Sequence, residues 1–296
     1  MFGKEIQIIT APSILGLKPN GVEKLPGALL AHHLQEKLHS TNELIAVPTL
    51  NHCYSKGRDS ITQIINTQTQ EIFLSSLQRA IESRVDPSQF LLVLGGDCSI
   101  LIGIMAALKA RGIYGLFFVD AHADFYEPEK STTGEAADMD LALITGRGPD
   151  LLQTSERPYV LDEHIIHLGQ RDMEESKKFG SQDIRATGIK CFDLPFIEEN
   201  GVEKTIQRVA DHFANISLDG YWIHFDTDVL SDEINPAVEY RLPGGLSFDQ
   251  CEKILKSLIQ QYNIVGMSIT IFNPTLDHDG KIASRLTEHI VKVFKE

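Results

Sequence analysis

The chain has 296 residues, of which 42% are hydrophobic and 23% charged, a composition typical of one or two globular domains and not of a disordered chain. Its 27 lysines and arginines and 41 aspartates and glutamates give a formal net charge of −14. Because nucleic-acid phosphates and anionic lipids attract basic surfaces, this acidity argues against both as partners.

The sequence also bears on the cellular compartment. No apolar run reaches the roughly 18 residues that a membrane span needs, and residues 1–10 lack the apolar core and cleavage site of a signal peptide. The four cysteines form no CxxC pair: Cys53, Cys98, Cys191 and Cys251. Since such sparse cysteines are typical of a reducing environment, we expect a cytoplasmic protein.

Short apolar runs alternate along the chain with longer amphipathic stretches. The runs predicted as strands are Glu5–Thr10, Leu44–Val47, Phe90–Leu94, Gly115–Val119, His164–Leu168, Gly188–Phe192, Tyr221–Phe225 and Ile264–Ile269. The stretches predicted as helices are Val22–Leu38, Ile61–Ser83, Ile100–Ala110, Met173–Phe179, Ile197–Ala214, Phe248–Gln261 and Gly280–Phe294. Fully apolar runs are typical of parallel strands covered on both faces. The alternation therefore predicts one doubly wound α/β domain over residues 1–296.

Polar residues follow three of the predicted strands at their carboxyl ends, where open α/β sheets bind ligands. The first segment, Gly-Gly-Asp-Cys-Ser, combines a tight turn with Cys98 at the start of a predicted helix. The helix dipole there would lower the pKa of the Cys98 thiol. Taken alone, an inert buried cysteine is the alternative interpretation.

The other two segments, Asp-Ala-His-Ala-Asp and Asp-Thr-Asp, carry carboxylates in alternating positions. Residues two apart share a side of extended backbone, so Asp120, His122 and Asp124 converge, as do Asp226 and Asp228. Four carboxylates gathered without cations would repel one another strongly. A helix cap or a surface position explains each residue singly. A divalent metal site explains them together, because carboxylate and imidazole are its usual ligands.

These three motifs, in this order and spacing, resemble the metal-binding motifs of the ureohydrolase family, which comprises arginases, agmatinases and formimidoylglutamases, with arginase the nearest branch. Further segments similar to the family are 11–12, 21–23, 168–172, 243–246 and 272–274. The resemblance implies a three-layer α/β/α domain with a mainly parallel sheet of about eight strands. It also implies two manganese ions, a bridging hydroxide that attacks a guanidinium carbon, and a homo-oligomer, either trimer or hexamer.

The resemblance assigns the metal ligands by position. Cys98 and Asp124 would bind one ion, His122 and Asp228 the other, and Asp120 and Asp226 would bridge them. Asp124 would also be catalytic, bonding the hydroxide and passing on its proton. The family usually has histidine in place of Cys98. Because a thiolate is softer than an imidazole, zinc, cobalt or iron could replace manganese there, or the subsite could stay empty.

The irregular stretch 126–148 resembles the family's substrate loop but departs from it. Tyr126 and Glu135 replace asparagines, Ala137 replaces a catalytic histidine, and Thr133 is also predicted to contact the substrate. Glu135 would repel a substrate α-carboxylate and suit a cationic or neutral tail. Without the histidine, protonation of the leaving group needs another group or water.

Four further positions stay open. Ile271 replaces a glutamate that pairs with the guanidinium in arginases, and Glu239 either compensates or is an exposed loop charge. Glu174 is predicted to meet a substrate amine, with a helix N-terminal acid as the alternative. His224 either supports the metal ligands or is a satisfied core histidine.

The leading hypothesis is metal-dependent hydrolysis of a linear C–N bond in a guanidino or amidino compound, with L-arginine the default substrate by family. A non-catalytic or impaired relative that binds metal and a metabolite or partner is the second hypothesis. The third makes Cys98 a nucleophile with His122 as its base, which leaves the clustered aspartates unexplained.

Overall fold

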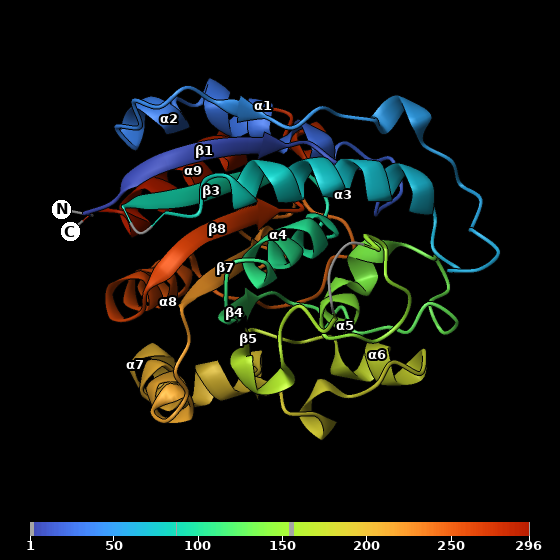
Figure 1. Ribbon diagram of the computed structural model, residues 1–296. Helices are drawn as coiled ribbons and strands as arrows, with labels where there is room; N and C mark the ends of the chain where they lie inside the picture. The colour runs from blue at the N-terminus through green and yellow to red at the C-terminus, as the bar shows by residue number, and fades with distance from the viewer. Residues whose placement is uncertain (1–2, 87, 154–156, 296) are drawn as a thin grey trace.

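The computed structural model describes residues 3–86, 88–153 and 157–295 of the chain. Within these residues an eight-stranded, all-parallel sheet has the order β2-β1-β3-β8-β7-β4-β5-β6 (Figure 1). The strands are β1 Glu5–Ala11, β2 Ile45–Ala46, β3 Gln89–Gly95, β4 Tyr114–Val119, β5 Ile165–Leu168, β6 Lys190–Phe192, β7 Gly220–Asp226 and β8 Ile264–Thr270. All the predicted strands are confirmed, and no strand end differs from its predicted position by more than two residues.

Helices cover both faces of the sheet. They are α1 Leu25–Ala31, α2 Leu34–Lys37, α3 Thr67–Glu82, α4 Ile100–Lys109, α5 Asp140–Ile144, α6 Met173–Lys178, α7 Leu194–Phe213, α8 Phe248–Gln261 and α9 Lys281–Val293. One apolar core packs α1, α2, α7, α8 and α9 against the sheet, and a second packs α3, α4 and α5 against the other face. The predicted three-layer α/β/α domain is therefore confirmed.

Two predicted helices have the wrong extent, and α5 was not predicted. The stretch Val22–Leu38 is not one helix, because His33 adopts a left-handed backbone (φ 61°) between α1 and α2. The stretch predicted from Ile61 begins as a helix only at Thr67. The carboxylate of Asp59 accepts the backbone N–H groups of Ile61 and Thr62 there, which forms a turn that competes with a helix.

The four central strands bring their carboxyl ends to one level. Leu94 pairs with Ile269, Ile269 with Phe225, and Phe225 with Val119, so the segments after β3, β8, β7 and β4 leave the sheet together. The turn after β3 is tight, because a Cβ on Gly96 would lie 1.8 Å from the carbonyl oxygen of Ser13, in the loop after β1. The register therefore gathers the polar segments at one edge of the sheet.

No helix in the described ranges is long and apolar enough to cross a membrane.

Candidate metal centre

The ends of β4 and β7 meet in a cluster of two carboxylates and one imidazole. Nδ1 of His122 lies 2.9 Å from Oδ2 of Asp228 and 3.8 Å from Oδ1 of Asp120. The backbone N–H of Ala121 donates to Asp228 at 3.2 Å, and that of His122 donates to Asp120 at 2.7 Å. One ligand atom from each of Asp120, His122 and Asp228 lies within 4.8 Å of the other two.

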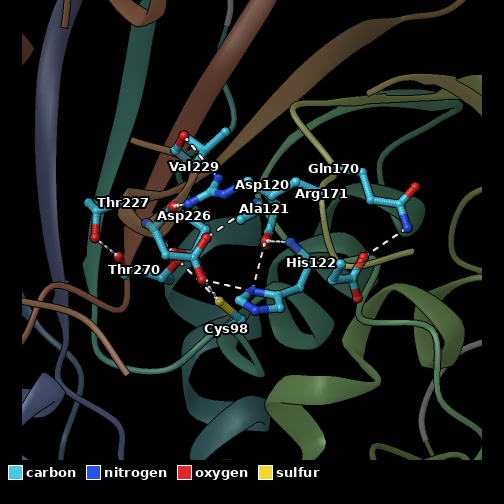
Figure 2. Close-up of polar contacts among 12 residues, drawn as sticks. Cys98, Asp120, Ala121, His122, Gln170, Arg171, Asp226, Thr227, Val229 and Thr270 are labelled. Carbon is cyan, nitrogen blue, oxygen red and sulfur yellow. Dashed lines mark hydrogen bonds and ion pairs between the residues drawn. The ribbon is translucent and has the colours of Figure 1, made fainter. Parts of the chain in front are cut away.

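A second cluster forms around Cys98, next to the N-terminus of α4. Its buried thiol lies 2.8 Å from Oδ2 of Asp226, to which it donates, and 3.2 Å from Oγ1 of Thr270 (Figure 2). Ligand atoms of Cys98, Asp120, His224 and Asp226 lie within 4.8 Å of one another. Because Asp120 belongs to both clusters, it lies where a ligand shared by two ions would lie.

The electrostatics of these clusters fit divalent cations. Burial, and then the neighbouring carboxylates, raise the pKa values of Asp120, Asp124 and Asp226 well above the usual range. Burial alone would lower the pKa of His122 and raise that of Asp228. The attraction between the imidazolium and the carboxylate outweighs burial, so the pKa of His122 rises to about 9 and that of Asp228 falls. Oδ2 of Asp120 is buried without a hydrogen-bond partner among the described residues. Cations would relieve both the repulsion and this unpaired oxygen, and the oxygen, nitrogen and sulfur donors are metal ligands.

The expectation that the helix dipole lowers the pKa of the Cys98 thiol is wrong. Burial, followed by the charge of Asp226 and then other carboxylates, raises this pKa well above its usual value, so desolvation and repulsion outweigh the dipole. His122, the base of the nucleophile hypothesis, is bound to Asp228 instead. This arrangement disfavours an activated Cys98 nucleophile.

Asp124 and the unanticipated Asp140 are two further buried carboxylates. Asp124 has a left-handed backbone (φ 45°) and lines the cavity beside the clusters, but it belongs to neither of them. Asp140, at the start of α5, is fully buried, and its Oδ2 has no partner in the described part of the chain. Its charge contributes to raising the pKa of Asp124, after burial itself. In the sequence Asp140 looks like an ordinary helix-capping residue, so no sequence pattern indicates that its side chain is buried.

Neighbouring segments hold the two strand ends in place. Nη2 of Arg171 donates to the carbonyl oxygen of Asp228 at 2.7 Å, which fixes the loop after β7 (Figure 2). Nε2 of His167 on β5 lies 2.7 Å from the carbonyl oxygen of His122. Burial lowers the pKa of His167 to about 4 and that of His224 to about 3, so both imidazoles are neutral at pH 7.

A cavity of about 280 Å³ opens onto the metal-site residues. Its metal-site wall comprises Cys98, His122, Asp124, Asp226 and Asp228. The remaining lining residues are Leu17, Tyr126, Thr132, Thr133, Ala137, Asp138, Asp172, Glu175, Phe179, Glu239, Tyr240, Arg241 and Ile271. The structure therefore brings the predicted residues Tyr126 and Thr133 to the cavity that holds the ligands.

Glu135 does not line this cavity, although it was predicted to contact the substrate. It is buried behind Tyr240, whose hydroxyl donates to Glu135 Oε2 at 2.7 Å, and Oε1 accepts the backbone N–H of Lys18 at 2.9 Å. Tyr240, which the sequence did not single out, presents its ring to the cavity. The Lys18 ammonium lies 4.5 Å from the centre of that ring and 3.7 Å from Glu239.

Two other acidic positions also differ from the expectation. The next residue along α6, Glu175, lines the cavity, whereas Glu174 does not. Asp138 lies in the cavity wall, where its Oδ2 accepts the hydroxyl hydrogen bonds of Ser131 (2.9 Å) and Thr133 (2.7 Å). Burial raises the pKa of Asp138 to about 7, although those two hydrogen bonds act to lower it. The direction of these loop side chains depends on tertiary packing, which no local pattern encodes.

Known proteins resemble this chain along almost its whole length. Arginase from Staphylococcus aureus (strain COL) is 29% identical over 99% of this chain and 98% of its own, and arginase from Bacillus subtilis (strain 168) is 28% identical over 97% and 98%. The crystal structure of arginase from Bacillus caldovelox superposes with a TM-score of 0.85, at 27% identity and 99% coverage of both chains. Formimidoylglutamase from Bacillus subtilis shares the fold, with a TM-score of 0.72 at 20% identity over 99% of this chain and 86% of that one.

The family comparison agrees with the motifs and the fold. The family model described as "Arginase family" matches residues 4–294. This match spans every strand of the sheet and both metal-ligand clusters. The chain therefore belongs to the arginase family of hydrolases.

Proposed function

We propose that this protein is a hydrolase that uses two divalent metal ions to cleave a linear C–N bond in a guanidino or amidino compound. The observation that carries the proposal is the convergence of buried Asp120, Asp226 and Asp228 with Cys98 and His122 beside one cavity. Membership of the arginase family supports the same reaction class.

The chain's own residues divide the work of this reaction. Cys98, Asp120 and Asp226 would hold one ion, and His122, Asp120 and Asp228 the other. Asp124, which the resemblance assigns to the Cys98-bound ion, belongs to neither cluster and stays a predicted ligand. Bound divalent cations would supply Lewis acidity that makes a water nucleophilic near neutral pH. Manganese is the family expectation, and the Cys98 thiol favours zinc, cobalt or iron at its subsite. Asp124 lines the cavity and is the carboxylate that we assign to accept the proton of the attacking water.

The outer cavity supports a substrate with a cationic or neutral tail. Asp172, Glu175 and Glu239 line it together with aromatic residues, and of these Glu239 also lies 3.7 Å from the Lys18 ammonium. Arg241 is the one arginine or lysine among the described lining residues, and it is already bound to Asp232, with Nη2 2.8 Å from a carboxylate oxygen. An α-carboxylate would therefore meet more negative than positive charge. This support replaces the argument from Glu135, whose carboxylate is bound within the protein.

A substrate panel tests the proposal. Protein loaded with manganese or zinc would be assayed with arginine, agmatine, hydroxyarginine, guanidinobutyrate and formimidoylglutamate for release of urea, amine or ammonia. We expect hydrolysis with a higher kcat/KM for agmatine than for arginine. Glu239→Gln should reduce that ratio, whereas Glu203→Gln on the α7 surface should leave it unchanged.

The panel has outcomes that count against the proposal. A metal-loaded protein that releases nothing from any of these compounds would contradict it and support the alternative of a non-catalytic relative. A preference for arginine over agmatine would contradict the tail assignment while leaving the reaction class intact. The cytoplasmic location and the homo-oligomer remain predictions.

A further inference from the structure

His224 lies in the middle of β7 with one ring nitrogen unpaired. The residue is fully buried, and Nδ1 lies 3.0 Å from Oγ of Ser268 on β8. Nε2 is buried without a hydrogen-bond partner among the described residues. Buried polar atoms are almost always paired, so a satisfied core histidine does not describe this residue.

The surroundings of His224 show what the free nitrogen can meet. Residues two apart on a strand share a face, so His224 lies on the same side of β7 as Asp226. One ring nitrogen of His224 is within 4.8 Å of ligand atoms of Cys98, Asp120 and Asp226. Asp120, another residue of this cluster, also has an oxygen, Oδ2, that is buried without a partner in the described part of the chain. Two residues of one small cluster thus each carry a buried polar atom that no described residue pairs.

We propose that His224 is a direct metal ligand, whose Nε2 joins Cys98 Sγ and the carboxylates of Asp120 and Asp226 around one ion. The proposal rests on the metal-binding part of the proposed function and not on its substrate. Neither the three strand-end motifs nor the family resemblance assigns a ligand to this position. His224 therefore supplies an imidazole to the ion that Cys98 binds.

The contacts of His224 suit a ligand. When Nδ1–H donates to the Ser268 hydroxyl oxygen, which also accepts from Nε1 of Trp222 at 3.1 Å, the Nε2 lone pair is free to bind a cation. The ring also stacks on Phe118, with centroids 4.9 Å apart at 22°, which limits its rotation. A hydrogen bond on the far nitrogen and a packed ring are how proteins orient metal-binding histidines.

The distances require only small adjustments. Bond lengths of about 2.0–2.3 Å around a tetrahedral ion place neighbouring ligand atoms roughly 3.3–3.8 Å apart. The cluster atoms lie within 4.8 Å of one another, and thiol and carboxylate are already 2.8 Å apart. On binding, the Cys98 thiol and the carboxyl groups of Asp120 and Asp226 release the protons they hold to the solvent, and the neutral imidazole loses none. The resulting set of sulfur, nitrogen and two oxygens suits zinc or cobalt better than manganese.

Cobalt titration of the full-length, metal-free protein tests the ligand without any substrate. Visible absorption reports the coordination of cobalt, and a near-ultraviolet charge-transfer band reports its bond to the Cys98 thiolate. We expect His224→Gln to weaken cobalt binding at the thiolate-bearing subsite by on the order of 100-fold and to change the visible bands. Ser268→Ala, which removes the orienting hydrogen bond of His224 together with the acceptor of Trp222 Nε1 but leaves the imidazole in place, should weaken it by about 10-fold.

His289→Gln is the control. His289 is a half-buried histidine that stacks on Phe248, lies 3.3 Å from Glu252 and belongs to neither cluster. We expect this variant to keep the charge-transfer band and its affinity. If His224→Gln titrates like the wild-type protein, or no worse than His289→Gln, the proposal is overturned.

X-ray absorption of the zinc-loaded wild-type protein does not depend on whether a variant folds. The spectrum averages over both ions, so one imidazole for each zinc supports the proposal, and one imidazole for every two zinc ions, as His122 alone would give, overturns it. Since neither measurement involves hydrolysis, a protein inert on every guanidino compound would contradict the proposed function and leave this inference intact.

Discussion

A metal-free preparation should lose stability as the pH rises from 6.5 to 9. In that window the folded chain keeps protons that the unfolded chain has released. Burial and neighbouring carboxylates raise the pKa values of Asp120 and Asp226, and Asp228 raises that of His122 to about 9 against the effect of burial. Each excess proton bound by the folded state makes stability fall with pH.

The window begins at pH 6.5 for a physical reason. Burial lowers the pKa values of His167 and His224 to about 4 and about 3. Below pH 6.5 these two histidines are therefore protonated in the unfolded chain but neutral in the folded protein. That contribution has the opposite sign and fades within about one unit above pH 6.5, as free histidine becomes neutral; over the window it is smaller than that of His122. Above 6.5 the clustered carboxylates and His122 set the slope.

The magnitude follows from His122 alone. One excess proton changes the free energy of unfolding by about 1.4 kcal/mol per pH unit. The rise of the His122 pKa from 6.5 to about 9 therefore removes about 3 kcal/mol across the window, a large part of the 5–15 kcal/mol typical of a domain.

Urea denaturation followed by circular dichroism, at several pH values between 6.5 and 9, measures this slope. One series contains a chelator and the other contains saturating manganese. In the chelator series the free energy of unfolding should fall as the pH rises. In the manganese series it should fall less or rise, because cations bind the deprotonated ligands. A chelated series that is flat or rises would refute the reasoning.

Three other predictions concern the surrounding structure. Tyr240→Phe leaves one oxygen of buried Glu135 unpaired and should cost about 1–3 kcal/mol in urea denaturation, and a change below about 0.5 kcal/mol would count against that hydrogen bond. Gly96→Ala places a Cβ 1.8 Å from the backbone oxygen of Ser13 and should destabilise the protein by several kcal/mol. Gly27→Ala, whose Cβ would have no atom within 4 Å, should be neutral or slightly stabilising. Equal effects of the two substitutions would disprove the packing argument. Burial raises the pKa of Asp138 to about 7, so the wild-type protein should lose about 2–3 kcal/mol of stability relative to Asp138→Asn as the pH rises from 5 to 8, and a constant difference would show that this carboxyl does not titrate there.

The sheet and most of the ligand set could be predicted from sequence because both depend on local periodicity. Buried parallel strands are continuous apolar runs, and alternation at a strand end places Asp120 and His122 on one side whatever the rest of the chain does. Even so, the pattern predicts one helix over Val22–Leu38, although His33 has a left-handed backbone, because a histidine gives no sign of a helix break in the sequence.

The cavity wall could not be predicted in the same way. The direction of Glu135 depends on Tyr240, 105 residues later, and on the backbone of Lys18. The free nitrogen of His224 likewise depends on Ser268 of a neighbouring strand. Such contacts between distant segments have no signal in a single sequence.

The register of the four central strands separates the two halves of substrate recognition. Groups that would act on the reacting carbon are fixed by paired backbone at the sheet edge, including Asp226 on β7. The cavity residues that we propose to face a substrate's tail, such as Tyr126 and Tyr240, come from loops. Substitutions in these loops can therefore change which tail is accepted without moving a metal ligand. A scaffold of this kind can acquire new substrates through loop changes while its hydrolytic chemistry stays the same.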